Sequence, residues 1–319
     1  MDIYYEKMDI YTDFDHYGHN NAQSITSIGR FESLHYGHVE LIKLVCKKAK
    51  EKNQLSSLIS IQKADAAHKK TIYTYSEKLQ LWEKLNLDNL FLIHITEDIS
   101  SISAKSFLLK ILLKKINSSE LVIGYDHQFG RNRRGTFKYL SRAAQKYNFI
   151  ANRIEAVKVN EKIVSTTLVK EHLLKGEMKE VNSLLYFGYF MEGIVIHGEK
   201  KGRKIGFPTA NIELSPYKLY PPEGVYAALV KFENKTFHAL LNIGYRPTVK
   251  GNSLSVETHL IDFSADLYGK KIQIYPLQKL RNEEKFSDLS ELNMNIHLDL
   301  KASRSVFNNL HDFIKLENL

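Results

Sequence analysis

The chain is 319 residues long, which is enough for two ordinary domains. Hydrophobic residues make up 43% and charged residues 25%, a balance typical of a globular protein with a sizeable core and unlike that of a disordered chain. Lysine and arginine exceed aspartate and glutamate by 45 to 36, which gives a net charge of +9. That excess favours an anionic partner such as nucleic acid, a membrane surface or nucleotide phosphates.

Two kinds of targeting segment are missing from the sequence. No apolar run approaches the roughly 20 residues of a transmembrane helix, and residues 1–20 lack the apolar stretch of a signal peptide. The single cysteine, Cys46, cannot form an internal disulfide, which fits a reducing compartment. We therefore expect a cytoplasmic protein with no membrane partner. Near the N-terminus, residues 2–7 (DIYYEK) are a candidate edge strand.

Glycine and proline divide the sequence into two parts of different character. All six prolines lie within 208–276 and half of the sixteen glycines within 188–251, whereas neither occurs within 38–123. A long stretch without these residues favours helices, and dense turn residues between short apolar runs favour antiparallel strands. The predicted organisation is a first domain over 1–170, a linker over 171–185 and a second domain over 186–319.

The N-terminal part alternates between short apolar strands and amphipathic helices. Within 39–52, for example, apolar residues recur at helical spacing and lysines occupy the other face. Strands that alternate with helices of about a dozen residues indicate a parallel, doubly wound, Rossmann-like sheet. The predicted strands are 24–28, 55–61, 90–95, 121–124 and 149–157, and the predicted helices are 39–52, one that begins near Ser76, 103–115 and 136–147.

The turn after the first strand carries the first chemical motif, residues 29–38 (GRFESLHYGH). Ligands of a doubly wound sheet bind where the first strand passes into the first helix. His35 and His38 lie at the start of that helix, where free N–H groups attract phosphate, and Gly37 lets a phosphate approach the backbone. Imidazoles can also stabilise charge that develops on phosphorus. The alternative interpretation is an ordinary helix start with two exposed histidines.

This motif resembles that of the nucleotidylyltransferases, and in particular the Gly-x-Phe-Asp-Gly-Val-His-x-Gly-His of the bacterial bifunctional riboflavin kinase/FMN adenylyltransferases. A second match to this family is residues 124–135 (GYDHQFGRNRRG). The resemblance implies an FMN adenylyltransferase domain in which His35, His38 and Asn132 are catalytic. It also implies that the residues binding ATP or its phosphates include Gly29, Phe31, Gly37, Gly124 and Asp126.

The sequence departs from the family pattern at three places. Glu32 and Ser33 stand where Asp-Gly is usual, and residues 61–65 (IQKAD) stand where the family has Pro-His-Pro. Lys170 replaces an arginine at the end of the block 165–170 (STTLVK). A lysine keeps the positive charge but loses the fork with which arginine holds a phosphate. We therefore expect Lys170 to bind phosphate and FAD synthesis to be slow.

A loop rich in glycine and lysine opens the second domain, at residues 193–211 (GIVIHGEKKGRKIGFPTAN). Its glycines permit close approach of the backbone, so the loop can surround the phosphates of ATP. A hydroxyl and an amide oxygen that follow are hard ligands suited to Mg²⁺. The alternative is a β-hairpin with a solvated basic tip. The expected ATP-binding residues are Gly198, Lys201, Gly202, Gly206, Pro208 and Thr209, and the expected Mg²⁺ ligands are Thr209 and Asn211.

The run GFPTAN at 206–211 resembles the riboflavin kinase motif, and five further blocks of that family follow in order. The resemblance implies a small antiparallel Greek-key β-barrel with a C-terminal helix, in agreement with the composition of this part of the chain. The six blocks are 206–211, 224–227, 242–248, 256–260, 266–269 and 280–286.

The family also implies roles for individual residues. Transfer of the γ-phosphoryl group of ATP to a ribityl hydroxyl needs a base that takes the proton, and a metal that neutralises charge. The glutamate of the family's Val-Glu-Thr-His-Leu block fills the role of the base, and here it is Glu257. Its alternative is an outward-facing acid on an alternating strand. Arg281, Glu284 and Phe286 are expected to bind the flavin.

The leading hypothesis is a bifunctional transferase. ATP and riboflavin would give FMN, and FMN and a second ATP would give FAD and pyrophosphate, with Mg²⁺ as the metal. One alternative is a riboflavin kinase whose N-terminal adenylyltransferase domain is weakened or inactive. Another is a nucleic-acid-binding protein that uses the arginines of 131–134, but the sequence contains no nucleic-acid module, so we expect small-molecule substrates and no nucleic-acid partner. Nothing in the sequence indicates an oligomeric state.

Overall fold

The computed structural model describes residues 8–17, 22–63, 70–198, 202, 205–248 and 251–318. Contacts within the chain divide it into two compact units. The first unit contains Met1–Lys69 and Lys78–Val164, and the second contains Lys70–Glu77 and Ser165–Leu319. The division differs from the expected boundaries in two ways: an inner segment of the N-terminal part belongs to the second unit, and that unit begins again at Ser165.

The segment expected to be a linker is largely helical. Helix α6 (Thr166–Lys175) and helix α7 (Met178–Leu184) contact each other, and α7 contacts the barrel strand β14 (Lys271–Arg281). Each helix buries one apolar face, through residues such as Val169 and Val181. The helices therefore belong to the core of the second unit because their apolar faces are buried there.

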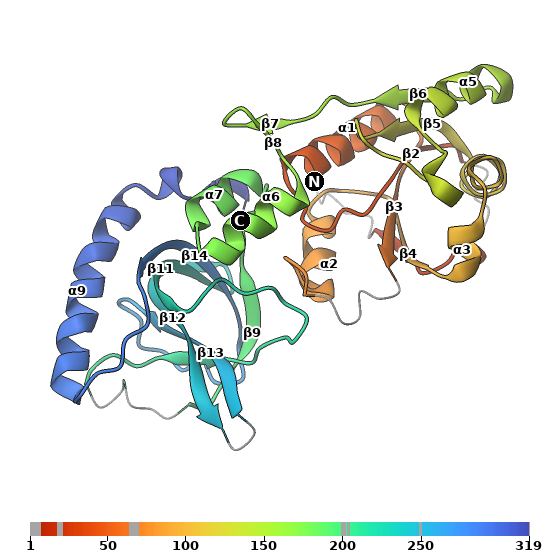
Figure 1. Ribbon diagram of the computed structural model, residues 1–319. Coiled ribbons are helices and arrows are strands. Elements are labelled where there is room, and N and C mark those ends of the chain that lie inside the picture. Colours follow the sequence, from red (N-terminus) through yellow and green to blue (C-terminus); the bar gives the residue numbers. More distant parts are fainter. Residues whose placement is uncertain are drawn as a thin grey trace, which may run out of the picture. The chain divides into compact units, whose positions relative to one another are not determined.

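The first unit is a parallel sheet with the strand order β1-β4-β3-β2-β5-β6 (Figure 1). Every neighbouring pair is parallel, so the predicted doubly wound fold is confirmed. The edge strand is formed by Asp9–Tyr11, whereas the candidate edge strand 2–7 lies outside the described residues. The strands are β1 (Asp9–Tyr11), β2 (Ser24–Gly29), β3 (Leu55–Lys63), β4 (Asn89–Ile95), β5 (Ser118–Ile123) and β6 (Ile150–Arg153).

The helices of this unit follow the predicted pattern with one difference in type. The predicted helix 103–115 is one short α-turn followed by a wider π-helix, and the N–H of Ile116 accordingly bonds to the carbonyl of Ile111 at 2.9 Å. The helical segments are α1 (Tyr36–Lys52), α2 (Tyr75–Glu83), α3 (Glu97–Ser101), α4 (Ala104–Ser106), the π-helix Phe107–Lys115, the short 3₁₀ turn Arg131–Arg133 and α5 (Phe137–Tyr147). A hairpin of β7 (Lys158–Val159) and β8 (Lys162–Ile163) follows.

The second unit is a closed antiparallel barrel with the strand order β10-β13-β12-β11-β14-β9. Strands β11, β12 and β13 are consecutive neighbours, and β14 returns to lie beside β11, which is the Greek-key arrangement that was predicted. The strands are β9 (Met191–Ile196), β10 (Ala210–Ile212), β11 (Gly224–Phe232), β12 (Lys235–Thr248), β13 (Gly251–Leu260) and β14.

A long C-terminal helix, α9 (Leu289–Asn308), runs along the outside of this barrel (Figure 1). It begins at Asp288, whose carboxylate accepts hydrogen bonds from the backbone N–H groups of Ser290 and Glu291. The helix contacts β11, β12 and β14. It thereby covers one part of the outer surface of the barrel, and the terminal helix expected from the sequence is confirmed.

The segment Lys70–Glu77 contributes a buried charge to the second unit. Glu77 and Lys218 have side chains that are each only 1% exposed, and they form an ion pair of 2.6 Å. Lys218 also donates to the carbonyl of Ile72 at 2.8 Å and lies over the rings of Tyr73 and Tyr189. Burial lowers the pKa of Lys218, and the neighbouring Glu77 carboxylate opposes this shift.

Glu77 uses its remaining lone pairs on backbone N–H groups. One carboxylate oxygen accepts from Thr74 at 2.7 Å and the other from Glu192 at 3.0 Å. The same segment pairs with the barrel unit through Thr71, which exchanges backbone hydrogen bonds with Tyr217 and Leu219 at 2.8 Å each. Lys70–Glu77 is therefore an integral part of the second unit, although it lies about 90 residues before the rest of that unit in sequence.

We predict that Glu77→Gln lowers the free energy of unfolding by about 3–5 kcal/mol, because it leaves the Lys218 ammonium buried without its counter-charge. The double variant Glu77→Leu with Lys218→Met should recover part of this loss, because it removes both charges but leaves the N–H groups of Thr74 and Glu192 without their acceptor. Urea unfolding followed by circular dichroism measures both effects. Glu51→Gln is the control, since its pair with Lys47 is exposed and should contribute less than about 1 kcal/mol. An equal loss in the control would contradict the prediction.

Candidate functional sites in the two units

The two motifs of the first unit meet at the carboxyl ends of β2 and β5. These strands pair in parallel and end at Gly29 and Ile123, immediately before or within the motifs 29–38 and 124–135. The strand order reverses at β2, because β3 lies on one side of it and β5 on the other. Such a switch point leaves a crevice for a ligand at the ends of the strands. The sequence motifs are therefore placed where a doubly wound sheet binds its ligand.

His35 caps the N-terminus of α1. Its Nδ1 accepts a hydrogen bond from the backbone N–H of His38 at 3.2 Å, so the proton of the neutral ring lies on Nε2. The two imidazole rings stack with their centroids 3.7 Å apart. Gly37 permits this arrangement, because a Cβ at that position would lie 3.2 Å from the His35 ring. The cap also explains why α1 begins at Tyr36, three residues before the predicted start.

Three imidazoles of this unit are held in the neutral form. Burial lowers the pKa of His35 to about 4 and that of His38 well below its usual value, the latter with a contribution from His35. Burial, together with the charge of Arg133, lowers the pKa of His127 to about 4. Within the described ranges, Nδ1 of His38 and Nε2 of His127 are enclosed without a hydrogen-bond partner. Both nitrogens therefore keep an unmet hydrogen-bonding capacity, and both residues line the same cavity.

A cavity of about 600 Å³ lies at this switch point. It includes five residues expected from the sequence, namely Gly29, Phe31, His38, Gly124 and Asp126. The sequence analysis did not single out the further polar residues that line it, which are Arg30, Ser100, His127, Gln128 and Arg133. Three of them, His127, Gln128 and Arg133, lie within the second motif, 124–135. Their place in this motif could have predicted that they line the cavity.

Asn132 and Lys170 are not among the residues that line this cavity. Asn132 is exposed and has a left-handed backbone with a φ of 58°, and the wall is formed instead by Arg133. Lys170 lies on α6 and belongs to the second unit. His35 and Gly37 shape the start of α1 next to the cavity and do not line it either. The structure therefore brings His38 to the cavity, whereas catalysis by Asn132 and phosphate binding by Lys170 remain predictions from the family resemblance.

In the second unit, one residue from each of five neighbouring strands lies in a single row across the barrel. The paired positions run from Asn211 on β10 to Glu257 on β13, Asn242 on β12, Val225 on β11 and Arg281 on β14. Residues directly opposite each other project from the same face of a sheet. The neighbouring positions in the strands, among them Leu241, Ile243, Val256 and Thr258, are fully or almost fully buried, so the row projects from the outer face of the barrel.

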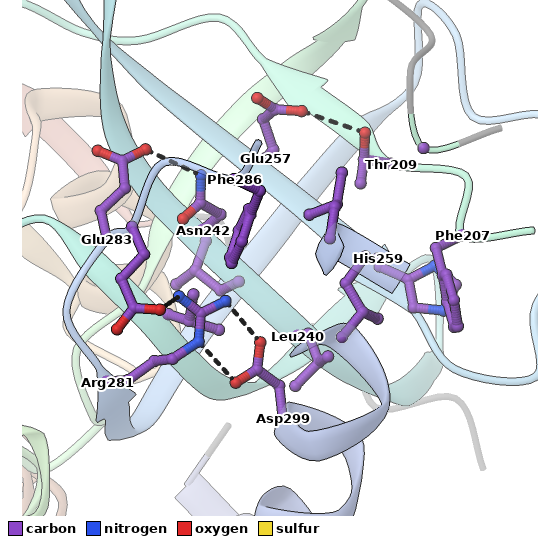
Figure 2. Close-up of a pocket in the computed structure, with 16 residues that line it drawn as sticks. Phe207, Thr209, Leu240, Asn242, Glu257, His259, Arg281, Glu283, Phe286 and Asp299 are labelled. Carbon is purple, nitrogen blue, oxygen red and sulfur yellow. Dashed lines mark hydrogen bonds and ion pairs between the residues drawn. The ribbon is translucent and has the colours of Figure 1, made fainter. Parts of the chain in front are cut away.

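Glu257 lies near the middle of this row. Its carboxylate accepts a hydrogen bond from the hydroxyl of Thr209 at 3.2 Å, and Figure 2 shows the two side chains pointing toward each other. Asn211 is buried beside them, and Gly198 is required there because a Cβ would overlap the Asn211 amide. The residues expected to act as base and as metal ligands are thus brought together, although they come from segments about 46 residues apart.

A cavity of about 450 Å³ lies between the row and α9. Its polar side chains are Thr209, Asn242, Glu257, His259, Arg281, Glu283, Glu284 and Asp299, and its apolar wall includes Phe207, Phe286, Leu292 and Ile296. The expected flavin-binding residues Arg281, Glu284 and Phe286 are all present. Glu283, one of the acids that follow Arg281 in the block 280–286, lines the cavity too. Sequence reasoning did not single out Asn242, although it lies in the recognised block 242–248. It missed Asp299 as well, because only the position of α9 brings that residue to the cavity.

A second cavity of about 920 Å³ adjoins the first. Phe207, Thr209 and His259 line both of them, so the two share a wall. The expected ATP-binding residues Gly206, Pro208 and Thr209 line this second cavity, and Gly202 lines the first. His259 is fixed by a hydrogen bond of 2.9 Å to the carbonyl of Pro208. Lys201 lies outside the described residues.

The oxygen donors at the junction fit one kind of metal ion. The described part of the chain holds no group of three or more His, Cys, Asp and Glu side chains that could bind a metal by themselves. Thr209, Asn211 and Glu257 offer a hydroxyl, an amide oxygen and one carboxylate within the same row or beside it. This small set of hard ligands suits Mg²⁺, which keeps several waters and binds phosphates of its substrate.

Comparison with known proteins identifies a family for each unit. Residues 18–168 match the FAD synthetase family and residues 185–307 match the riboflavin kinase family. The crystal structure of a macrolide-efflux protein from Streptococcus pneumoniae superposes with a TM-score of 0.83 at 24% identity, covering 93% of this chain and 98% of that one, which shows a shared fold. Among the residues that the structure describes, no helix is long and apolar enough to cross a membrane.

Two curated relatives extend over both units. The bifunctional riboflavin kinase/FMN adenylyltransferase of Buchnera aphidicola subsp. Schizaphis graminum is 33% identical over 299 residues, which is 90% of this chain and 95% of the relative. The enzyme of the same description from Bacillus subtilis is 30% identical over 299 residues, 91% of this chain and 94% of the relative. Because such relatives align almost from end to end, this chain belongs to the bifunctional riboflavin kinase/FMN adenylyltransferase family.

Proposed function

We propose that the second unit transfers the γ-phosphoryl group of ATP to riboflavin, giving FMN and ADP. The observation that carries this proposal is the position of Glu257 in the row. Glu257 lines the first cavity and is bonded to Thr209, which belongs to the wall that the first cavity shares with the second. Phosphoryl transfer needs a donor and an acceptor on either side of the transferred group, with a base beside the acceptor hydroxyl. The two cavities supply these two places.

The first cavity is assigned to the flavin and the second to ATP. The flavin is a planar aromatic ring with polar edges, and the first cavity offers the Phe286 ring, apolar side chains of α9 and several polar groups. The second cavity contains the Gly206–Thr209 part of the glycine loop, whose backbone can approach phosphates closely. Glu257 then takes the proton of the ribityl hydroxyl as its oxygen attacks the γ-phosphorus.

Thr209 and Asn211 would hold Mg²⁺ beside the phosphates, where the ion neutralises negative charge during transfer. The hydroxyl of Thr209 donates a hydrogen bond to the Glu257 carboxylate, so the lone pairs of the Thr209 oxygen are left for the ion. The chain itself positions the carboxylate and the two neutral oxygens through the barrel register. Glu257 is thereby directed toward the acceptor hydroxyl.

We propose further that the first unit adenylylates FMN. An oxygen of the FMN phosphate bonds to the α-phosphorus of ATP, and the bond from that phosphorus to the bridging oxygen breaks to release pyrophosphate, which leaves FAD. Neutral His38 donates an N–H hydrogen bond to the phosphates at the positive end of α1, and His35 fixes this helix terminus as its cap. The FAD synthetase family match over residues 18–168 supports two activities over a kinase alone.

Glu257→Gln tests the kinase assignment. We expect FMN formation from riboflavin, ATP and Mg²⁺ to fall by about 10²–10⁴-fold, because the amide cannot act as a base. FAD formation from supplied FMN should be unchanged, since it takes place in the first unit. Glu233→Gln, at an exposed turn between β11 and β12, is the matched control. Wild-type FMN formation by Glu257→Gln would remove the proposed base.

His38→Ala tests the adenylyltransferase assignment. FAD formation from FMN and ATP should be lost, while FMN formation from riboflavin should be unaffected, because only the first unit loses a phosphate donor. His94→Ala is the control, since His94 is exposed on β4 and does not line the cavity. A wild-type FAD rate in His38→Ala would place this reaction elsewhere.

The neutral histidines also predict how stability depends on pH. Their pKa values are lowered in the folded state, so below about pH 6.5 the unfolded chain binds more protons. The free energy of unfolding of the first unit should therefore be constant above pH 7 and fall between pH 6.5 and 4, by up to about 1.4 kcal/mol per pH unit for each histidine. Urea unfolding followed by the fluorescence of the buried Trp82 reports on this unit.

His127→Phe should make this pH dependence shallower by up to one proton, because a phenyl ring occupies the same space and does not titrate. His94→Gln should leave the slope as it is, since His94 is exposed in the folded state. An identical slope in wild type and His127→Phe would contradict the assignment of His127 as a buried neutral group.

A further inference from the structure

Asp299 joins helix α9 to the last strand of the barrel. Its two carboxylate oxygens accept hydrogen bonds from Nε and Nη2 of Arg281, both at 2.9 Å. The Asp299 side chain is 7% exposed and that of Arg281 is 20% exposed, so the pair is largely removed from water. A bidentate pair of this kind fixes the plane of the guanidinium as well as its position. Figure 2 shows Arg281 reaching from β14 and Asp299 reaching from α9.

The remaining contacts of Arg281 are also with its own unit. Nη1 donates to the carbonyl of Asn282 at 3.2 Å and lies 3.9 Å from the carboxylate of Glu284. The guanidinium carbon lies 5.4 Å from the centroid of the Phe286 ring. One edge of the Arg281 guanidinium is therefore bonded to Asp299. The flat face of the guanidinium lies beside the Phe286 ring in a fixed orientation. This geometry suits contact with a planar ring better than it suits a clamp for phosphate.

Helix α9 supplies the other side of the same cavity. Leu292, Ile296 and Asp299 all line it and are spaced four and three residues apart, so they lie on one face of the helix. Leu292 and Ile296 are only partly buried, which leaves apolar surface for a ligand, whereas Asp299 is buried at the end of this face. The distance between the apolar face of α9 and the barrel thus depends on the Arg281–Asp299 pair.

We propose that Asp299 is a positioning residue of the riboflavin kinase site: by fixing Arg281, it holds α9 against the rim of the barrel and sets the shape of the slot that receives the flavin ring. The proposal rests on the proposed kinase function and adds a residue that acts on flavin affinity. It assigns no role to Asp299 in the transfer of the phosphoryl group. The residue acts through Arg281, Phe286 and the face of α9.

Asp299→Asn tests the proposal, because it keeps the size of the side chain and removes its charge. The KM for riboflavin should rise about 10- to 100-fold, the range expected for loss of a charged bidentate hydrogen bond. The KM for ATP and the kcat at saturating riboflavin should change by less than about threefold. Titration of riboflavin fluorescence gives the binding constant independently of turnover, and it should shift with the KM. Asp299→Glu keeps the charge and should restore part of the affinity.

Asp312→Asn is the matched control. It removes the same charge from the same unit at an exposed site next to His311, and it should leave both KM values unchanged. An unchanged riboflavin KM and binding constant in Asp299→Asn would overturn the role of Asp299 while the kinase function stands. A wild-type protein that neither binds nor phosphorylates riboflavin would overturn the kinase function itself. These two failures are therefore distinguishable.

A further variant covers the case in which Asp299→Asn does not fold. Replacing both partners, Arg281→Met with Asp299→Leu, removes the buried charges and keeps most of the packing. Circular dichroism establishes whether this variant is folded. The folded double variant should still bind riboflavin more weakly than wild type, because α9 and the wall of the slot lose their fixed orientation. Wild-type affinity in the double variant would likewise overturn the proposal.

Discussion

The candidate site of the second unit depends on the register of the closed barrel. Side chains of a strand alternate between its two faces, so a shift of β13 by one residue would turn Glu257 toward the core and bring Val256 or Thr258 to the outside. In a closed barrel each strand is paired on both sides, so the register of one strand constrains all the others. The carboxylate is therefore held by the backbone hydrogen bonds of the whole barrel rather than by a local loop.

In the first unit, a helix terminus rather than a set of paired strands fixes the positions of the polar side chains. The cavity of this unit includes His38 from the first turn of α1, and His35 satisfies a free N–H group of that helix with its own ring. The cap determines which ring nitrogen carries the proton, and burial keeps the ring neutral. One side chain thus caps the helix and keeps its own proton on Nε2. In this unit the end of a helix positions the polar side chains, whereas in the barrel the paired strands position them.

Sequence patterns were sufficient for the fold of both units and for the residues that are close in sequence. The alternation of strands and helices predicted the parallel sheet, and the resemblance of the glycine loop and the blocks after it to riboflavin kinases implied the barrel. Asp299 could not be found in this way, because it lies 18 residues after Arg281 on a helix whose docking the sequence does not specify. Asn132, which the family resemblance places in the first site, is exposed on a left-handed turn and does not line the cavity, whereas its neighbour Arg133 does. The linker predicted over 171–185 rests on the change in glycine and proline content, which does not reveal that part of α6 and all of α7 occupy this segment.

The discontinuous second unit has a consequence for how such a protein can change over evolutionary time. Glu77 is encoded within the N-terminal half of the chain, but its charge is needed around Lys218. A genetic crossover near residue 165 would join halves with different ancestors, and the new protein would inherit Lys218 with whatever residue the other parent has at position 77. Such an exchange preserves the second unit only when both parents share the pair or when both positions are apolar. The two halves are thus less freely interchangeable than two domains joined by a simple tether.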